Sequence, residues 1–243
     1  MTLLVTVNEA EEDQAGALGV DAVIAVVGLA IEARIAGTAA MIADGDRTAF
    51  LLRDAIRQGA RGVISFGVCG GLDPKLRPGK TVIASSVLAG KGEAYPSDLH
   101  WAEELRRMIP GSGYSPIAGV ASPMTCFEER RDFHATTGAV AADMESQIVA
   151  RIAAEFRIPF AACRVVLNPA HRTLPRAALI NIGPAGKPAL RKIGGSVLKD
   201  PRQLPKLGRL AVDAVIAVRA LHSAKQRLGN HLGFPHLRSR ARN

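Results

Sequence analysis

Six apolar runs, each bounded by chain-breaking residues, constrain the fold of this chain more than any other feature. Runs of this length without polar interruption are typical of strands that are buried on both faces of a sheet. They cover residues Leu3 to Val7, Ala22 to Val27, Gly62 to Phe66, Thr81 to Val87, Ile117 to Ala121 and Phe160 to Leu167. Helical patterns lie between several of them, near Arg47 to Gln58, Asp98 to Met108, Glu128 to Thr136 and Met144 to Phe156. This alternation predicts the α/β class, with a mainly parallel sheet flanked by helices.

The length and the apolar content of the chain predict one main domain. With 243 residues and 48% apolar side chains, the chain can fill a single core. We place this domain at residues 22–221, after a leader of residues 1–21 and before a basic, weakly ordered tail of residues 222–243. Two amphipathic segments, Ala185 to Lys199 and Gln203 to Leu221, predict basic helices at the end of the domain.

The charge of the chain is concentrated in its last third. Residues 171–243 hold 15 Lys and Arg against 2 Asp and Glu, whereas residues 1–170 hold 16 against 20. Such a basic region indicates either a solvated surface or an anionic partner, and peripheral contact with an anionic membrane is one such partnership. Aromatic side chains make up only 4% of the chain, and no zinc-finger or RNA-binding signature is present, which argues against nucleic acid.

The three cysteines indicate the redox environment. Cys69, Cys126 and Cys163 show no CxxC spacing and leave an odd number, which argues against both a zinc site and a disulfide framework. The N-terminus has no basic start, and no stretch is long and apolar enough to cross a bilayer. We therefore expect a cytoplasmic protein, with contact at the inner membrane face as the one variation, and no bound metal.

A glycine-rich segment, Gly67 to Gly71, follows one of the predicted strands. Glycine accepts positive φ angles and lets backbone N–H groups approach a ligand oxygen closely, so the segment is a candidate anion site. It is neither a P-loop nor a dinucleotide fingerprint, because Lys-Ser/Thr and GxGxxG are both absent. A tight connection without a ligand remains the alternative.

Charged residues also follow the strand Ala22 to Val27. Gly28 ends this strand and leads into a helix that carries Glu32 and Arg34. In an open α/β sheet this position lies at the ligand-binding edge, which makes both side chains candidates for the site. The alternative is that Glu32 only stabilises the first turn of the helix and that Arg34 is a surface charge.

Two further segments end at the same edge. Asp143, Met144 and Glu145 open a helix, where a carboxylate can cap the helix or accept hydrogen bonds from two vicinal hydroxyls of a sugar. Asn168 ends the strand Phe160 to Leu167, and its amide can donate to and accept from a heterocycle, or form an Asn-Pro turn. Together the segments predict a site for an anion, a sugar and a base.

Taken together, these segments resemble the nucleoside phosphorylase and nucleosidase superfamily, which includes purine nucleoside phosphorylases and 5′-methylthioadenosine/S-adenosylhomocysteine nucleosidases. The family pattern combines a G-S-A-G-G type turn, a ribose element ending in M-E and a base element R-x-x-S-D. The counterparts here are Gly67 to Gly71, Met144-Glu145 and Arg164 to Asn168. The hopanoid-associated phosphorylases are the closer match, on Gly28 to Arg34, Ser65 to Pro74 and Pro169 to Pro175.

The resemblance implies a single-domain, Rossmann-like phosphorylase fold with a central mixed, mainly parallel sheet, and cleavage of the N-glycosidic bond of a purine nucleoside. In the closer subgroup, adenosylhopane and inorganic phosphate would give adenine and phosphoribosyl hopane in hopanoid biosynthesis, without any other cofactor, and a homo-oligomer is expected. The implied substrate-binding residues are Met144, Glu145, Phe127, Asn168 and His171, with Asn168, Glu145 and Glu32 as catalytic groups. The implied phosphate-binding residues are Gly28, Gly67, Val68, Cys69, Gly70, Arg34 and Arg172.

Two positions depart from the family pattern. Val68 stands where relatives carry a serine hydroxyl, and Asn168 stands where adenine-releasing relatives carry an aspartic acid. A neutral amide cannot act as a general acid, so protonation of the base would need water or another group such as His171. Three alternatives therefore stay open: a hydrolytic nucleosidase for small adenine thioethers, a nucleoside or lipid binder without catalysis, and nucleic-acid binding by Lys225 to Asn243.

Overall fold

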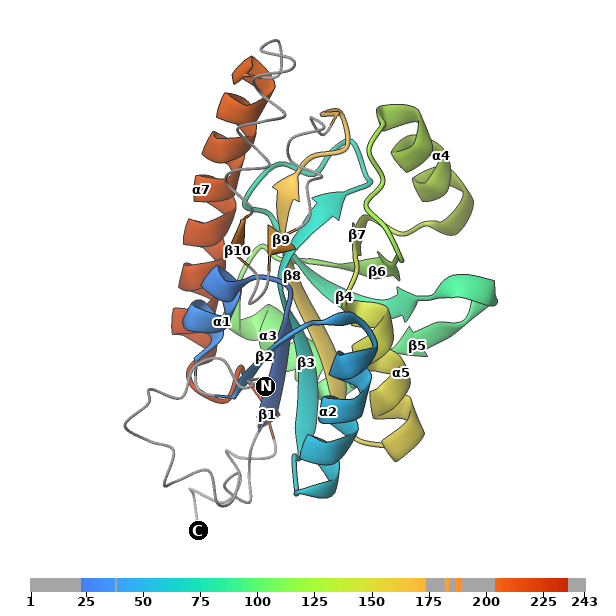
Figure 1. The fold of residues 1–243 in the computed structure, drawn as a ribbon, viewed down its shortest axis with the longest axis vertical. Helices are drawn as coiled ribbons and strands as arrows, with labels where there is room; N and C mark the ends of the chain where they lie inside the picture. The colour runs from blue at the N-terminus through green and yellow to red at the C-terminus, as the bar shows by residue number, and fades with distance from the viewer. Residues whose placement is uncertain (1–22, 38, 174–181, 184–186, 189–203, 236–243) are drawn as a thin grey trace.

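The computed structural model describes residues 23–37, 39–173, 182–183, 187–188 and 204–235. Within them, eight strands form one mixed sheet with helices on both of its faces (Figure 1). These strands are β1 (Val23–Val27), β2 (Ala40–Ile42), β3 (Gly62–Gly71), β4 (Thr81–Leu88), β5 (Ala94–Pro96), β6 (Gly113–Gly119), β7 (Ala141–Asp143) and β8 (Phe160–Asn168). The helices are α1 (Ala30–Ala36), α2 (Gly45–Arg57), the 3-10 turn η2 (Gly90–Gly92), α3 (Leu99–Met108), α4 (Phe127–Thr137), α5 (Ser146–Phe156) and α7 (Leu204–Leu228).

The predicted α/β class and mixed, mainly parallel sheet are confirmed. Strand β3 lies at the centre between β1 and β8, and it is parallel to both. Strand β4 is parallel to β6 but antiparallel to β5 and β8, which makes the sheet mixed. A separate pair, β9 (Ile182–Gly183) and β10 (Lys187–Pro188), is antiparallel. Predicted segments Leu3 to Val7 and Ala185 to Lys199 fall wholly or mostly outside the described residues, as does the leader of residues 1–21.

The glycine-rich segment is part of a strand rather than the predicted turn. Strand β3 continues through Gly71, because Gly70 and Gly71 pair with β7 while the other side of the segment pairs with β8. The register against β8 shifts between Cys69 and Gly70, which is a bulge next to the end of the strand. Of the glycines in this segment, only Gly67 has a positive φ, 154°. The prediction of a turn is therefore wrong, since two neighbouring strands supply partners for this backbone.

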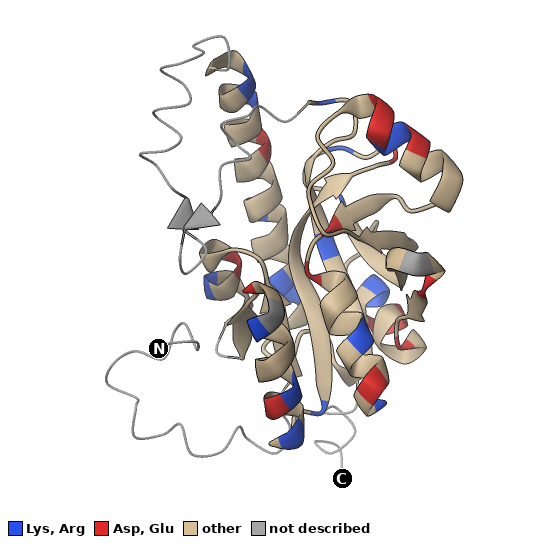
Figure 2. Cartoon of the chain, turned by 45° about the vertical axis from the view of Figure 1, so that its right-hand side comes forward, with Lys and Arg blue, Asp and Glu red and all other residues tan. Residues whose placement is uncertain are grey.

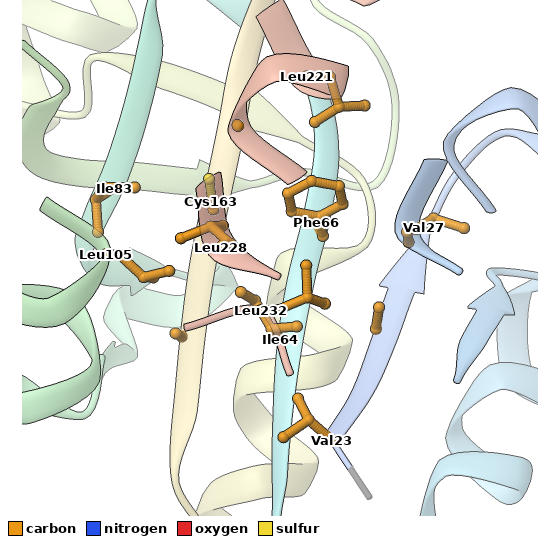
Figure 3. Packing of buried hydrophobic residues seen from close by; sticks show 14 of the residues in the cluster. Val23, Val27, Ile64, Phe66, Ile83, Leu105, Cys163, Leu221, Leu228 and Leu232 are labelled. Carbon is orange, nitrogen blue, oxygen red and sulfur yellow. The ribbon is translucent and has the colours of Figure 1, made fainter. Parts of the chain in front are cut away.

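The end of the domain also lies later than residue 221. Helix α7 continues to Leu228, and the chain after it stays in the core, where Leu232 and Phe234 are buried. The ring of Phe234 meets Trp101 edge-on, and Trp101 Nε1 donates to Leu232 O at 2.9 Å. Figure 3 shows side chains of α7 and of the segment after it packed against the central strands. The boundary at residue 221 was wrong because these apolar residues follow a basic stretch that looked like a solvated tail.

Charged residues lie mainly on the helices, whereas the strands in the middle of the molecule are nearly free of them (Figure 2). A few charged residues are buried, on helices as well as on strands: Glu32, Arg130, Asp143, Arg164 and Asp213. Buried charges are costly unless they are paired or hydrogen-bonded, so their partners identify the region to examine. None of the described helices has the length and apolarity needed to cross a bilayer.

Candidate functional site

A cavity of about 240 Å³ lies where β1, β3 and β8 end, next to the start of α5. The structure thus brings together the three segments singled out in the sequence, together with Gly28 and Glu32. The polar lining comes from Glu32, Arg130, Asp143, Glu145 and Asn168. The remaining lining residues are Gly28, Leu29, Val68, Cys69, Gly70, Leu72, Val120, Pro123, Met124, Ala142, Met144 and Leu167.

Glu32 occupies the anion-binding position that the sequence suggested for an external ligand. Its carboxylate accepts hydrogen bonds from the backbone N–H groups of Gly28 at 2.8 Å, Leu29 at 2.9 Å and Val68 at 2.7 Å. A Cβ atom at Gly67 would lie 2.6 to 2.8 Å from the same carboxylate, which explains the glycine. Two predicted phosphate donors, Gly28 and Val68, therefore donate to a carboxylate of the chain itself.

Burial and hydrogen bonds act on Glu32 in opposite directions. The side chain is only 1% exposed, and this burial raises the pKa of Glu32, while Arg164 and the three N–H donors favour the ionised form. The carboxylate is held by donors on both oxygens. Its structural role is to join the loop after β1 to the middle of β3.

Arg164 is the cation among the carboxylates that line the cavity, although it is not itself a lining residue. It is fully buried in β8, and its Nη2 donates to Glu145 Oε2 at 3.2 Å and to Ser65 Oγ. Its Nε lies 3.1 Å from Asp143 Oδ2. Burial works against the charged form, yet the nearby carboxylates raise the pKa of Arg164 overall, so the guanidinium stays charged. One cation thus serves three carboxylates, those of Asp143, Glu145 and Glu32.

Asp143 has the capping role that the sequence allowed. Its Oδ1 accepts from the N–H groups of Glu145 at 2.9 Å and Ser146 at 2.7 Å, and its Oδ2 accepts from Ser146 Oγ at 2.6 Å. Helix α5 consequently begins at Ser146, two residues after the predicted start. By capping the helix, Asp143 fixes the direction in which the next two side chains leave the sheet.

Glu145 is the carboxylate of this group with access to the cavity. Its side chain is 17% exposed, compared with 1% for Arg164. The pKa of Glu145 is raised to about 7: burial is the main cause, the negative charges of Asp143 and Glu32 add to it, and Arg164 opposes them. A Cβ atom at Gly28 would lie 2.6 Å from Glu145 Oε1, so the glycine gives this carboxylate its space. Met144 beside it is exposed and also lines the cavity.

Asn168 and Arg130 also line the cavity, and both are buried. A guanidinium carries only donors, so the amide oxygen of Asn168 faces Arg130 and accepts from its Nη1 and Nη2, both at 2.8 Å. Arg130 also donates to backbone oxygens of Met124, Pro169 and Arg172. Burial lowers the pKa of Arg130, an effect that the charge of Glu129 opposes.

Sequence reasoning did not identify Arg130. It lies in α4, where the pattern of Glu128 to Thr136 predicted a helix and no motif surrounds it. Its neighbours on the helix are mostly exposed, and only the fold shows that this one arginine turns inward against the end of β8. Arg164 was visible as the first residue of the base element but received no role.

Besides Gly67, which lies against the Glu32 carboxylate, four predicted residues are absent from the lining of the first cavity. His171 and Arg172 line a second cavity of about 470 Å³, which shares Asn168 with the first and is completed by Lys206, Arg209, Leu210, Asp213 and Thr173. There Arg172 forms an ion pair with Asp213 of α7. Arg34 is exposed in the last turn of α1, and the ring of Phe127 contacts Arg131 at 5.9 Å. Neither is among the described residues that line these two cavities.

The carboxylates of the site are largely engaged by hydrogen bonds and by Arg164. Among the residues that the structure describes, no group of three or more His, Cys, Asp or Glu side chains could hold a metal ion. Glu32 and Asp143 already accept several hydrogen bonds each, and Glu145 faces Arg164.

Comparison with known proteins finds a family model and solved structures that are similar to this chain. A family model described as "Phosphorylase superfamily" matches residues 14–194, whereas no curated protein matches the sequence. Among solved structures, a mutant MTAN of Helicobacter pylori with 5′-methylthioadenosine in its active site has 14% identity and a TM-score of 0.58, covering 83% of this chain and 96% of that one.

Two other solved structures are similar to the same extent. A futalosine hydrolase mutant of Helicobacter pylori has 12% identity and a TM-score of 0.58, covering 83% of this chain and 97% of that one. A 5′-methylthioadenosine/S-adenosylhomocysteine nucleosidase of Colwellia psychrerythraea in complex with adenine has 15% identity and a TM-score of 0.55, covering 86% of this chain and 96% of that one. At these identities the structures establish a common fold.

Proposed function

This chain belongs to the phosphorylase superfamily, and from that membership and the charges of its cavity we propose that it cleaves the N-glycosidic bond of a purine nucleoside. The solved structures with the same fold include enzymes whose names describe nucleosidase and hydrolase activity. The function is proposed from the site itself, because one fold can carry unrelated activities.

The observation that carries this proposal is the separation of charge along the cavity. Glu32, Asp143 and Glu145 gather around Arg164, whereas Arg130 and Asn168 pair with each other. All of these residues except Arg164 line the cavity. Cleavage of an N-glycosidic bond passes through a state in which the sugar resembles an oxocarbenium ion and the base departs with negative charge. Carboxylates next to the sugar and a cation with an amide next to the base stabilise that state more than the uncharged substrate. The sugar therefore belongs beside Glu145 and Met144, and the base beside Asn168.

Water is the nucleophile that these charges favour. A phosphate dianion between the ring and Glu32 would be repelled by three carboxylates that share one arginine. Two of the predicted phosphate donors, Gly28 and Val68, are bonded to Glu32, and Arg172 pairs with Asp213 in the neighbouring cavity. We infer that hydrolysis is the main reaction of this site.

Phosphorolysis is the second candidate, and one feature favours it. The bulge between Cys69 and Gly70 interrupts the ladder to β8, and both residues line the cavity. A bulge leaves a backbone group without its regular partner, which is a suitable donor for an oxyanion. In that case inorganic phosphate is the co-substrate, as the resemblance to hopanoid-associated phosphorylases implies.

The apolar part of the lining supports an apolar 5′ substituent on the nucleoside. Leu29, Val120, Pro123, Met124 and Met144 contribute to it. A thioether and a hopane both satisfy this requirement, so 5′-methylthioadenosine and adenosylhopane are the two substrates to compare. A hopane-linked substrate would have to be taken from a membrane.

Helix α7 supports peripheral contact with an anionic membrane. Leu204, Val212, Val215 and Ile216 are between 43% and 59% exposed on this helix. Lys206 and Arg209 are exposed on the same half of it. Apolar side chains with flanking cations are typical of helices that lie in a lipid interface. Co-sedimentation with anionic and neutral vesicles tests this contact, and equal recovery in the supernatant with both would contradict it.

The function is tested by incubating the purified full chain with inosine, adenosine, 5′-methylthioadenosine and adenosylhopane, each with and without phosphate. We expect release of the base and of a free sugar in the absence of phosphate. Release that requires phosphate, with a sugar 1-phosphate as product, would establish phosphorolysis instead. Absence of base release from all four nucleosides would contradict cleavage and leave a nucleoside or lipid binder. As a variant control, Glu145→Gln should lower the rate by roughly a hundredfold, because it removes the negative charge that stabilises the oxocarbenium-like sugar while keeping an acceptor oxygen.

A further inference from the structure

The second cavity, of about 470 Å³, is lined by the end of β8, the segment after it and the first half of α7. It is rich in cations and shares only Asn168 with the first cavity among the described residues. The described residues that line it are Asn168, His171, Arg172, Thr173, Lys206, Arg209, Leu210 and Asp213. Nucleoside cleavage as proposed above uses none of these cations, so the cavity is a candidate for a second ligand.

The charges of this lining do not cancel. Asp213 is the only acid among the described lining residues, and its buried carboxylate forms an ion pair with Arg172. Lys206 and Arg209 are exposed, and neither has a hydrogen-bond or ion-pair partner within the part of the chain that the structure describes. Three cations and one carboxylate leave a formal charge of +2, without counting His171.

Lys206 and Arg209 lie where a helix disfavours positive charge. Both are in the first two turns of α7, and Pro205 agrees with a helix that begins here, because a proline has no N–H group and fits the first turn. Figure 2 shows blue segments near the upper end of this helix, with a red segment below them. A helix N-terminus favours anions, and like charges three positions apart repel each other. An anion bound between the two side chains would offset both effects.

A phosphate group with a single ester bond matches this cavity in charge and in hydrogen bonding. It carries a charge of about −1.5 to −2 near pH 7 and has three strong acceptor oxygens. A carboxylate or a phosphodiester carries one negative charge and would leave part of the charge of the lining uncompensated. Guanidinium and ammonium groups both bind phosphate oxygens with charge-assisted hydrogen bonds, and the ring of His171 can add an N–H donor.

We propose that the second cavity is a binding site for a phosphomonoester, which Arg172, Lys206 and Arg209 hold. Asp213 positions Arg172, because their ion pair joins the segment after β8 to α7. The site is separate from that of the inorganic phosphate of a phosphorolysis, which would act beside the sugar in the first cavity. It does not depend on nucleoside cleavage, because none of the three cations lines the first cavity.

The exposed apolar residues of α7 favour a lipid as the source of this phosphate. Val212 and Ile216 follow Arg209 by three and seven positions, which places all three side chains on the same side of the helix. Val212 is 59% exposed and Ile216 is 43% exposed. A lipid could therefore place its headgroup phosphate in the cavity and its acyl chains against these two residues. A soluble phosphomonoester is the other source, and the experiment has one arm for each.

The first arm measures binding of glycerol 3-phosphate to the full chain by isothermal titration calorimetry. We expect Lys206→Gln and Arg209→Gln each to weaken the affinity by about tenfold, because each removes a charge-assisted hydrogen bond to phosphate. The matched control is Arg219→Gln, which removes the same charge from an exposed position of α7 that lines neither cavity. Its affinity should stay within about twofold of that of the unchanged protein.

The second arm measures co-sedimentation of the full chain with phosphatidylcholine vesicles of two kinds. One kind contains phosphatidic acid, which is a phosphomonoester, and the other contains phosphatidylglycerol, which is a phosphodiester, at matched surface charge. If a lipid is the source, more protein should sediment with phosphatidic acid, and Arg209→Gln should remove this preference whereas Arg219→Gln should not. Attraction to surface charge alone would affect both vesicles and both variants equally.

The two arms together decide whether the cavity binds a phosphomonoester. Binding of glycerol 3-phosphate without a preference between the vesicles supports the site and assigns it to a soluble ligand, whereas a preference for phosphatidic acid assigns it to a lipid. Absence of both effects would overturn the proposal, and so would equal losses for Arg209→Gln and Arg219→Gln. Neither measurement involves a nucleoside, so failure of the cleavage assay would contradict the proposed function and leave this result unchanged.

Discussion

Arg164 and Arg130 are two buried arginines next to one cavity, and they differ in whether carboxylates are among their partners. Arg164 lies among the carboxylates of Asp143, Glu145 and Glu32. The hydrogen-bond acceptors of Arg130 are three backbone oxygens and the amide of Asn168, all of which are neutral. The same side chain therefore produces opposite local fields. Where carboxylates outnumber the cation the site favours positive charge, and where neutral oxygens hold the cation it favours negative charge.

Under the proposed function, this difference would let the two arginines stabilise opposite charges on the sugar and on the base. The carboxylates raise the pKa of Arg164, whereas burial lowers that of Arg130. Each arginine is positioned by a different kind of structure. Arg164 lies inside β8, and Arg130 reaches the end of β8 from α4. Changes at the two arginines should consequently affect stability to different degrees.

Replacing Arg164 should have the largest effect on stability. Arg164→Met removes the only cation that contacts Asp143 and Glu145 among the described residues, leaving buried carboxylates without a counter-ion. Breaking a buried ion pair in this way costs about 3–5 kcal/mol. Urea denaturation should show a larger loss for Arg164→Met than for Arg130→Met. Equal losses would show that the two arginines differ less than their partners suggest, and Arg34→Met, at an exposed position, is the control.

The next largest effect is expected in the pH dependence of the free energy of unfolding, through Glu145 beside Arg164. The pKa of Glu145 is raised from 4.5 to about 7, so the folded chain binds a proton between those values that the unfolded chain has released. The contribution of Glu145 to the free energy of unfolding is fully present below pH 4.5 and is lost as the pH rises through about 7. The loss is on the order of 3 kcal/mol at most. Glu145→Gln should reduce this fall in unfolding free energy. An unchanged pH profile in the variant would contradict the raised pKa.

Two glycines on β3 should show how tightly the Glu32 carboxylate is packed. Gly67→Ala places a methyl group against the Glu32 carboxylate at a residue with positive φ, and should cost about 1–3 kcal/mol. Gly70→Ala is the matched control, because its Cβ would meet only Ala142 O at 3.8 Å. Thermal unfolding of both variants provides the comparison. A similar melting temperature for the two would indicate that Glu32 moves aside readily.

The smallest effect is expected for an arginine–glutamate pair in solvent. Arg53 and Glu155 form hydrogen bonds of 2.8 to 3.1 Å on the surface between α2 and α5. Water and salt screen this pair, so Arg53→Ala should change the midpoint of urea denaturation far less than Arg164→Met. A comparable loss in both would mean that burial does not account for the importance of Arg164.

Much of the scaffold could be predicted from local patterns. The long strands β1, β4 and β8 and the helices α2, α3 and α4 lie within about two residues of their predicted positions, because continuous apolar runs and helical spacing are properties of neighbouring residues. Strands β2, β5 and β7 have three residues each, which is too short for such a pattern. The prediction of a turn at Gly67 to Gly71 is wrong for a related reason. The short strand β7, which has no pattern of its own, pairs with Gly70 and Gly71 and so extends β3.

The sequence by itself determined the class of fold, the edge of the sheet at which the site lies and most of the residues that meet there. Only the tertiary structure decided what those residues bind. It assigned the N–H groups of Gly28 and Val68 to Glu32, gathered three carboxylates around Arg164, and brought Arg130 from α4 against Asn168. The physical reason is that secondary structure follows from spacing along the chain, whereas charge compensation and hydrogen-bond direction depend on groups brought together from distant segments.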